Sequence, residues 1–151
     1  LYSDAQFCFD FAKNLYGEEN TIVYGRSLGG SFAVKVAAEN YPKTVILEAT
    51  FYNLQDIVNR WLPKKVTDKV SPTMTYHFLS NENISKIKVP LYHFHGTKDN
   101  VVPIKSGKKL FEVFEKSQPK ITKKFIEISG ATHDDLINHE NFVEELKKIL
   151  Q

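Results

Sequence analysis

The sequence has few of the residues that build cross-linked or metal-bound proteins. Its 151 residues include a single cysteine, Cys8, which excludes an internal disulfide and a multi-cysteine metal site. One thiol is consistent with a reducing compartment but does not establish one. No apolar run approaches the roughly 20 residues that a membrane-spanning helix needs.

Charge of one sign is not in excess either. Twenty basic and 18 acidic residues give a formal net charge of +2, and no dense basic stripe with interleaved aromatic residues is present, so we expect no nucleic-acid partner. A content of 42% hydrophobic and 25% charged residues is ordinary for a soluble globular protein. The length suits one core, and we expect one domain over residues 1–151.

The chain begins with Leu1 rather than methionine and runs directly into a helix-like stretch. This start predicts a truncated or proteolytic piece, and a signal peptide or membrane anchor could have been lost upstream. The location is therefore left open between cytoplasmic and membrane-associated.

The most informative stretch is Gly25-x-Ser27-x-Gly29. The β-branched and aromatic run at 21–24 predicts a buried strand before it, and the apolar spacing after it predicts a helix to about residue 40. A strand, a sharp turn and a helix around this pattern are typical of a nucleophile elbow. The alternative is a glycine-rich turn with an incidental serine.

The elbow has physical requirements that the glycines can meet. A strained turn at Ser27 favours flanking residues without a Cβ, which Gly25 and Gly29 supply. Gly30 would let the helix pack close to the strand. The helix N-terminus then offers free N–H groups where an oxyanion would develop.

The rest of the chain alternates between strand and helix patterns, which predicts an α/β fold with about four parallel strands flanked by helices. Further strands are expected at 43–49, 89–94 and 125–128, and helices at 3–16, 53–62, 73–79, 104–116 and 142–150. In the first helix we expect Ser3 as N-cap, Gly17 as the stop and Cys8 as a small core residue.

Residues 51–87 have weak periodicity and predict a small helical cap insertion over the sheet. Phe51, Trp61 and Phe78 could line an acyl pocket there, or could only pack the cap onto the domain. The sequence does not decide between the two.

Ser27, Asp99 and His133 each follow a predicted strand. Because carboxyl ends of parallel strands share one edge of a sheet, these side chains are expected to meet there. A serine hydroxyl needs a base to take its proton, and His133 can both accept that proton and return it to a leaving group. Asp99 would hold the imidazole in the right tautomer. The order Ser, Asp, His is that of α/β-hydrolases.

Other residues compete for these roles. The alternative acids are Glu48, Asp134 and Asp135, and the alternative bases are His77, His93, His95 and His139. We expect His93 and His95 to pack within a strand, and Asp134 and Asp135 to be solvated or to cap a helix. No metal-ligand spacing, dinucleotide fingerprint or Walker loop occurs, so we expect no metal and no cofactor.

Four segments together resemble the small single-domain α/β-hydrolases: residues 25–30, 47–51, 95–103 and 130–133. Membrane-associated serine hydrolases of the budding-emergence type and protein depalmitoylases look nearest. Prolyl-oligopeptidase-like and dienelactone-hydrolase-like proteins share parts of the pattern. The resemblance covers nearly all of the chain.

The resemblance implies Ser27 as nucleophile, Asp99 as acid and His133 as base, with the backbone of Leu28 as one oxyanion donor. We also expect Arg26, Phe51 and Trp61 to contact substrate. The implied activity is cleavage of a small acyl ester or thioester through an acyl-serine. The alternatives are a serine peptidase with the same triad and a hydrolase-like domain that only binds.

Complete members have about eight strands, and this sequence matches the second half, without the loop that supplies the second oxyanion donor. We therefore predict that the chain alone is poorly active, because losing one donor typically costs around 10²–10³ in turnover. We also predict self-association, or pairing with the missing half, through the edge at 21–24. Monomeric sedimentation together with full esterase turnover from this chain alone would contradict both predictions.

Overall fold

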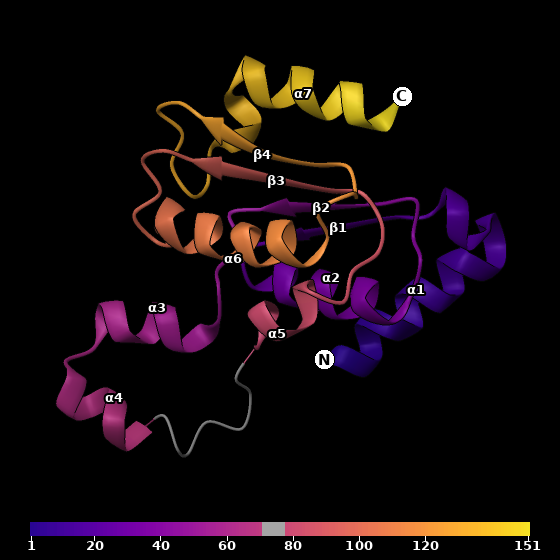
Figure 1. Cartoon of the computed structure of the whole chain (residues 1–151). Coiled ribbons are helices and arrows are strands. Elements are labelled where there is room, and N and C mark those ends of the chain that lie inside the picture. The colour runs from indigo at the N-terminus through magenta and orange to yellow at the C-terminus, as the bar shows by residue number, and fades with distance from the viewer. Residues whose placement is uncertain (71–77) are drawn as a thin grey trace.

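The computed structural model describes residues 1–70 and 78–151 (Figure 1). In chain order its elements are α1 (Tyr2–Tyr16), a 3₁₀ turn (Glu18–Asn20), β1 (Ile22–Arg26), α2 (Leu28–Glu39), β2 (Thr44–Glu48), α3 (Leu54–Trp61), α4 (Lys64–Val70), α5 (Ser80–Ile84), β3 (Leu91–Gly96), α6 (Ile104–Ser117), β4 (Lys123–Ile128), a second 3₁₀ turn (Leu136–Asn138) and α7 (Glu140–Leu150).

The four strands form one parallel sheet in the order β1-β2-β3-β4. Its register pairs Arg26 with Glu48 and Gly96 with Ile128. Helix α7 covers one face, whereas α2, α5 and α6 cover the other (Figure 1). The predicted α/β class with four flanked parallel strands is confirmed.

Strand boundaries differ from the predictions by about two residues. Strand β1 continues to Arg26 because the backbone N–H of the next residue, Ser27, still bonds the carbonyl of Glu48 at 2.8 Å. Strand β3 starts at Leu91, since Pro90 has no N–H to donate, and it extends to Gly96. Strand β4 also includes two polar lysines at its start.

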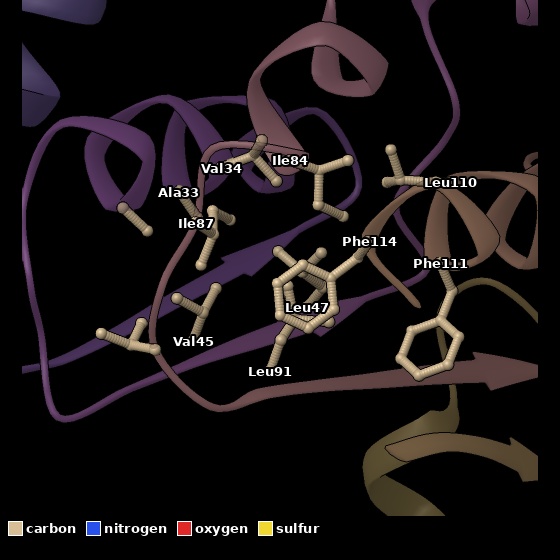
Figure 2. Packing of buried hydrophobic residues seen from close by; sticks show 12 residues of the cluster. Ala33, Val34, Val45, Leu47, Ile84, Ile87, Leu91, Leu110, Phe111 and Phe114 are labelled. Carbon is tan, nitrogen blue, oxygen red and sulfur yellow. The ribbon is translucent and has the colours of Figure 1, made fainter. Parts of the chain in front are cut away.

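Two apolar clusters hold the layers together. All five residues of β2 are buried, as expected of a strand covered on both faces. On one face its Val45 and Leu47 pack with side chains of α2, α5 and α6, as Figure 2 shows for Leu110 and Phe114. On the other face, Ile46 belongs to the cluster beneath α7.

Helix α1 differs from its sequence prediction at two positions. Leu1, not Ser3, is the N-cap, whereas Gly17 ends the helix at φ 86° as expected. Cys8 is exposed rather than a core residue, and Phe9 is the buried side chain. Helix α1 packs on α2, where the ring of Tyr2 lies edge-on to that of Phe32 at 5.2 Å between centroids.

The free edge of β1 lies beside an apolar groove. Within the described residues, no strand pairs with this edge. A groove of about 440 Å³ runs between α1, β1 and the start of α2. Three further apolar side chains of α1 are exposed: Phe7, Phe11 and Leu15. A partner at this edge stays a prediction.

The segment between β2 and β3 leaves the sheet and forms α3, α4 and α5 (Figure 1). Its start is anchored: the Asn53 side chain accepts a bond from the backbone N–H of Asp56, and Ser106 of α6 donates to the Asp56 carboxylate at 2.5 Å. Phe51 and Phe78 pack together with Val102. His77 and residues 73–77 of the predicted helix at 73–79 lie outside the described residues.

In the described part of the chain, none of the helices combines the length and the apolar character needed to cross a bilayer.

Candidate active site

Ser27 lies at a strained turn between β1 and α2. Its backbone has φ 50° and ψ −120°, a conformation that a non-glycine residue adopts only when its surroundings impose it. A Cβ at Gly25 would come within 2.6 Å of the Ala33 Cβ, so the elbow requires glycine there. The predicted need for glycine at Gly29 is wrong within the described residues, because nothing lies within 4 Å of a Cβ at that position.

The close approach of the helix to the strand predicted for Gly30 is present, because a Cβ on Gly25 of β1 would lie 2.7 Å from the Gly30 Cα. A Cβ at Gly30 would also lie 1.9 Å from Oγ1 of Thr50, just after β2. The start of α2 therefore packs against β1 and against the residues that follow β2.

Three side chains from three loops meet beyond the carboxyl ends of the strands. Nε2 of His133 lies 3.1 Å from Oγ of Ser27. Nδ1 of His133 lies 2.8 Å from Oδ2 of Asp99. A carboxylate only accepts hydrogen bonds, so Nδ1 carries the proton and Nε2 is free to accept one from Ser27. His133 and Asp99 are both buried.

The Asp99 carboxylate is fixed by its own loop. Oδ1 accepts the backbone N–H groups of Val101 and Val102 at 2.9 and 2.8 Å. Burial raises the pKa of Asp99, but hydrogen bonds from His133, His95 and the Val102 backbone outweigh it and hold the pKa well below its ordinary value. Asp99 is therefore ionised at neutral pH and faces His133 as a carboxylate.

The competing acids and bases lie elsewhere. Glu48 is buried against Tyr24 and Arg26. Asp134 is largely exposed, and Asp135 accepts the backbone N–H of Thr132. Burial, with the neighbouring His95 second, holds the pKa of His93 well below its ordinary value. His139 is the N-cap of α7.

His95 has a contact that the sequence analysis missed. Its buried Nε2–H donates to the Val102 carbonyl at 2.9 Å and lies 3.5 Å from Oδ2 of Asp99. His95 thus holds both the loop and the carboxylate from behind. The four-residue spacing from His95 to Asp99 across a strand exit was the available signal.

The residues expected to contact substrate are placed differently from one another. Phe51 is 4% exposed and packs in an apolar cluster, whereas Trp61 is 59% exposed at the end of α3. The Arg26 guanidinium contacts protein groups around His133. Leu28 is the first residue of α2, so its backbone N–H has no acceptor within the helix.

The arrangement suits covalent chemistry at Ser27. A hydroxyl, a base in the accepting tautomer and an orienting carboxylate form one hydrogen-bonded chain. Across residues 1–70 and 78–151, no three His, Cys, Asp or Glu side chains come together in a way that could hold a metal ion.

The chain is similar in sequence to known hydrolases. Lysophosphatidylserine lipase ABHD12 of Danio rerio is 30% identical over 134 residues, covering 78% of this chain and 35% of its own length. Human alpha/beta hydrolase domain-containing protein 17B is 28% identical, covering 99% of this chain and 49% of its own length. The chain thus spans half or less of these curated relatives.

Solved structures show the same fold. The esterase Est2 of Thermogutta terrifontis, bound to propionate, superposes with a TM-score of 0.70 at 17% identity, over 99% of this chain and 63% of that one. The sequence model of the dienelactone hydrolase family matches residues 9–148, nearly the whole chain. The chain therefore belongs to the dienelactone hydrolase family of α/β-hydrolases.

Proposed function

We propose that this chain carries the catalytic residues of a serine hydrolase that cleaves carboxylic esters or thioesters. The observation that carries the proposal is the chain Ser27 Oγ to His133 Nε2 at 3.1 Å and His133 Nδ1 to Asp99 Oδ2 at 2.8 Å. The esterase and lipase names among the similar proteins support this class.

In the first half of the reaction, Ser27 Oγ attacks the acyl carbonyl carbon while its proton passes to Nε2 of His133. Charge develops on the carbonyl oxygen, and the Leu28 N–H can stabilise it. The bond to the leaving oxygen or sulfur then breaks. That group takes the proton from Nε2 and departs, which leaves an acyl-Ser27.

In the second half, water gives a proton to Nε2 of His133 and attacks the acyl carbon. The intermediate collapses, the acid is released, and the proton returns to Ser27 Oγ. Throughout, the ionised Asp99 stabilises the imidazolium and holds Nδ1–H toward itself.

A fluorophosphonate probe tests the nucleophile directly. In the full-length protein we expect stoichiometric labelling at Ser27, lost in Ser27→Ala and retained in the control Ser117→Ala, which changes an exposed serine on α6. The measurement is peptide mass spectrometry of the adduct. Labelling that survives Ser27→Ala would count against the proposal, and an absence of any labelling would favour the domain that only binds.

The same probe examines the chain alone. Because Leu28 offers one oxyanion donor, we propose that residues 1–151 by themselves react roughly 10²–10³-fold more slowly than the full-length protein. Equal rates would mean that the described chain already contains both donors. A panel of acyl esters and amides of the same acyl group separates esterase from peptidase action.

A further inference from the structure

We propose that Arg26 is a positioning residue that braces the His133 loop, residues 129–135, against the nucleophile elbow. This inference rests on the proposed function. Nη2 of Arg26 donates to the backbone carbonyl of His133 at 2.7 Å and to Oδ1 of Asp134 at 2.6 Å. Its backbone directly precedes Ser27. The Arg26 side chain thus links the residue before the nucleophile Ser27 to the backbone of the base His133.

The brace connects the two edges of the sheet. Arg26 ends β1 at one edge, and the His133 loop follows β4 at the other. Three inter-strand spacings separate those edges, roughly 14 Å. Neither strand pairs with the other, so the sheet connects Ser27 to His133 only through the two strands between them. The guanidinium supplies a direct connection across that gap.

Glu48 holds the guanidinium from its other side. Oε1 of this buried carboxylate lies 3.3 Å from Nε of Arg26, and Oε2 accepts a hydrogen bond from the Tyr24 hydroxyl. Burial first, and then Glu48, raise the pKa of Tyr24 well above its ordinary value, so the hydroxyl stays protonated and keeps donating. Glu48 therefore occupies Nε and leaves Nη2 directed at the loop.

The bond to the His133 carbonyl carries more weight than the ion pair with Asp134. The Asp134 side chain is 81% exposed, so water and salt screen that pair. The carbonyl instead belongs to a buried residue and is part of the base's own backbone. Displacing it would move the imidazole relative to Ser27, and small misplacements of reacting groups have large effects on rate.

This role differs measurably from the substrate contact expected from the sequence. Arg26→Met in the full-length protein keeps the length and apolar stem but removes the donors. On p-nitrophenyl acetate, a small uncharged ester, we expect kcat to fall about 10–100-fold while KM stays within about twofold. Arg26→Lys, which retains one cationic donor, should recover part of kcat. Lys108→Met, an exposed cation of similar exposure paired with Glu127, is the control.

The outcomes separate cleanly. A raised KM with unchanged kcat would identify Arg26 as a substrate contact and overturn the brace. So would Arg26→Met with kcat within threefold of the wild type. Thermal unfolding checks that each variant folds. If Arg26→Met does not fold, kcat of the folded Arg26→Lys variant is the deciding measurement, and a kcat below that of the wild type supports the brace. A wild-type protein that neither labels at Ser27 nor turns over the ester would refute the proposed function, and the brace with it.

Discussion

Replacing Asp99 with asparagine is expected to lower the turnover of an ester by about 10⁴-fold, the size of effect measured for the equivalent change in a serine protease triad. Oδ1 of Asp99 accepts two backbone N–H groups, so the amide oxygen of asparagine must take that place. The NH₂ group then faces Nδ1 of His133 and donates to it. The ring proton moves to Nε2, which can no longer accept a proton from Ser27.

The measurement is kcat on p-nitrophenyl acetate for the full-length protein, with circular dichroism to check folding. Asp10→Asn, an exposed change on α1, is the matched control and should leave kcat unchanged. A loss smaller than about tenfold in folded Asp99→Asn would show that Asp99 does not set the tautomer of His133.

Gly30→Ala is expected to destabilise the folded protein by about 3 kcal/mol, at the upper end for an overpacked core. The added Cβ would lie 1.9 Å from Oγ1 and 2.5 Å from Cγ2 of Thr50, a side chain with no exposed surface. Neither group can turn away into solvent. Helix α2 must therefore move away from the exit of β2. Urea unfolding of the full-length protein measures the change.

Two variants test the cause. Thr50→Ala in the Gly30→Ala background removes the two closest atoms and leaves only the Thr50 Cβ, at 2.7 Å, so the double variant should lose less stability than the sum of the single changes. Gly29→Ala adds a methyl in the same turn, where nothing described lies within 4 Å, and should not destabilise. Equal losses at Gly29 and Gly30 would point to helix geometry rather than to Thr50.

The sequence was sufficient for the parts of the fold that depend on local pattern. Alternating strand and helix periods gave the parallel sheet, and three strand exits placed Ser27, Asp99 and His133 at one edge. These features follow from chain direction and spacing, which sequence contains. Helix α6 (Ile104–Ser117), predicted at 104–116, is an example of a helix whose boundaries were found within one residue.

Features that depend on distant partners were not predictable in this way. Cys8 is exposed and its neighbour Phe9 is buried, a choice of face that periodicity does not specify. The partner of Gly30 is Thr50, twenty positions along the chain, and that of Arg26 is the His133 loop, more than a hundred positions away. Such pairings arise only when the sheet has brought the segments together.

The sheet supports the strands that carry the three reacting groups to different extents. Acid and base follow β3 and β4, two strands paired over their whole length, whereas the nucleophile follows β1, which the described chain supports on one side alone. Partial opening of the molecule from that side would withdraw the serine while the carboxylate–imidazole dyad stayed assembled. Activity is therefore expected to be lost before the molecule unfolds globally, and that loss would report on the β1 edge of the sheet alone.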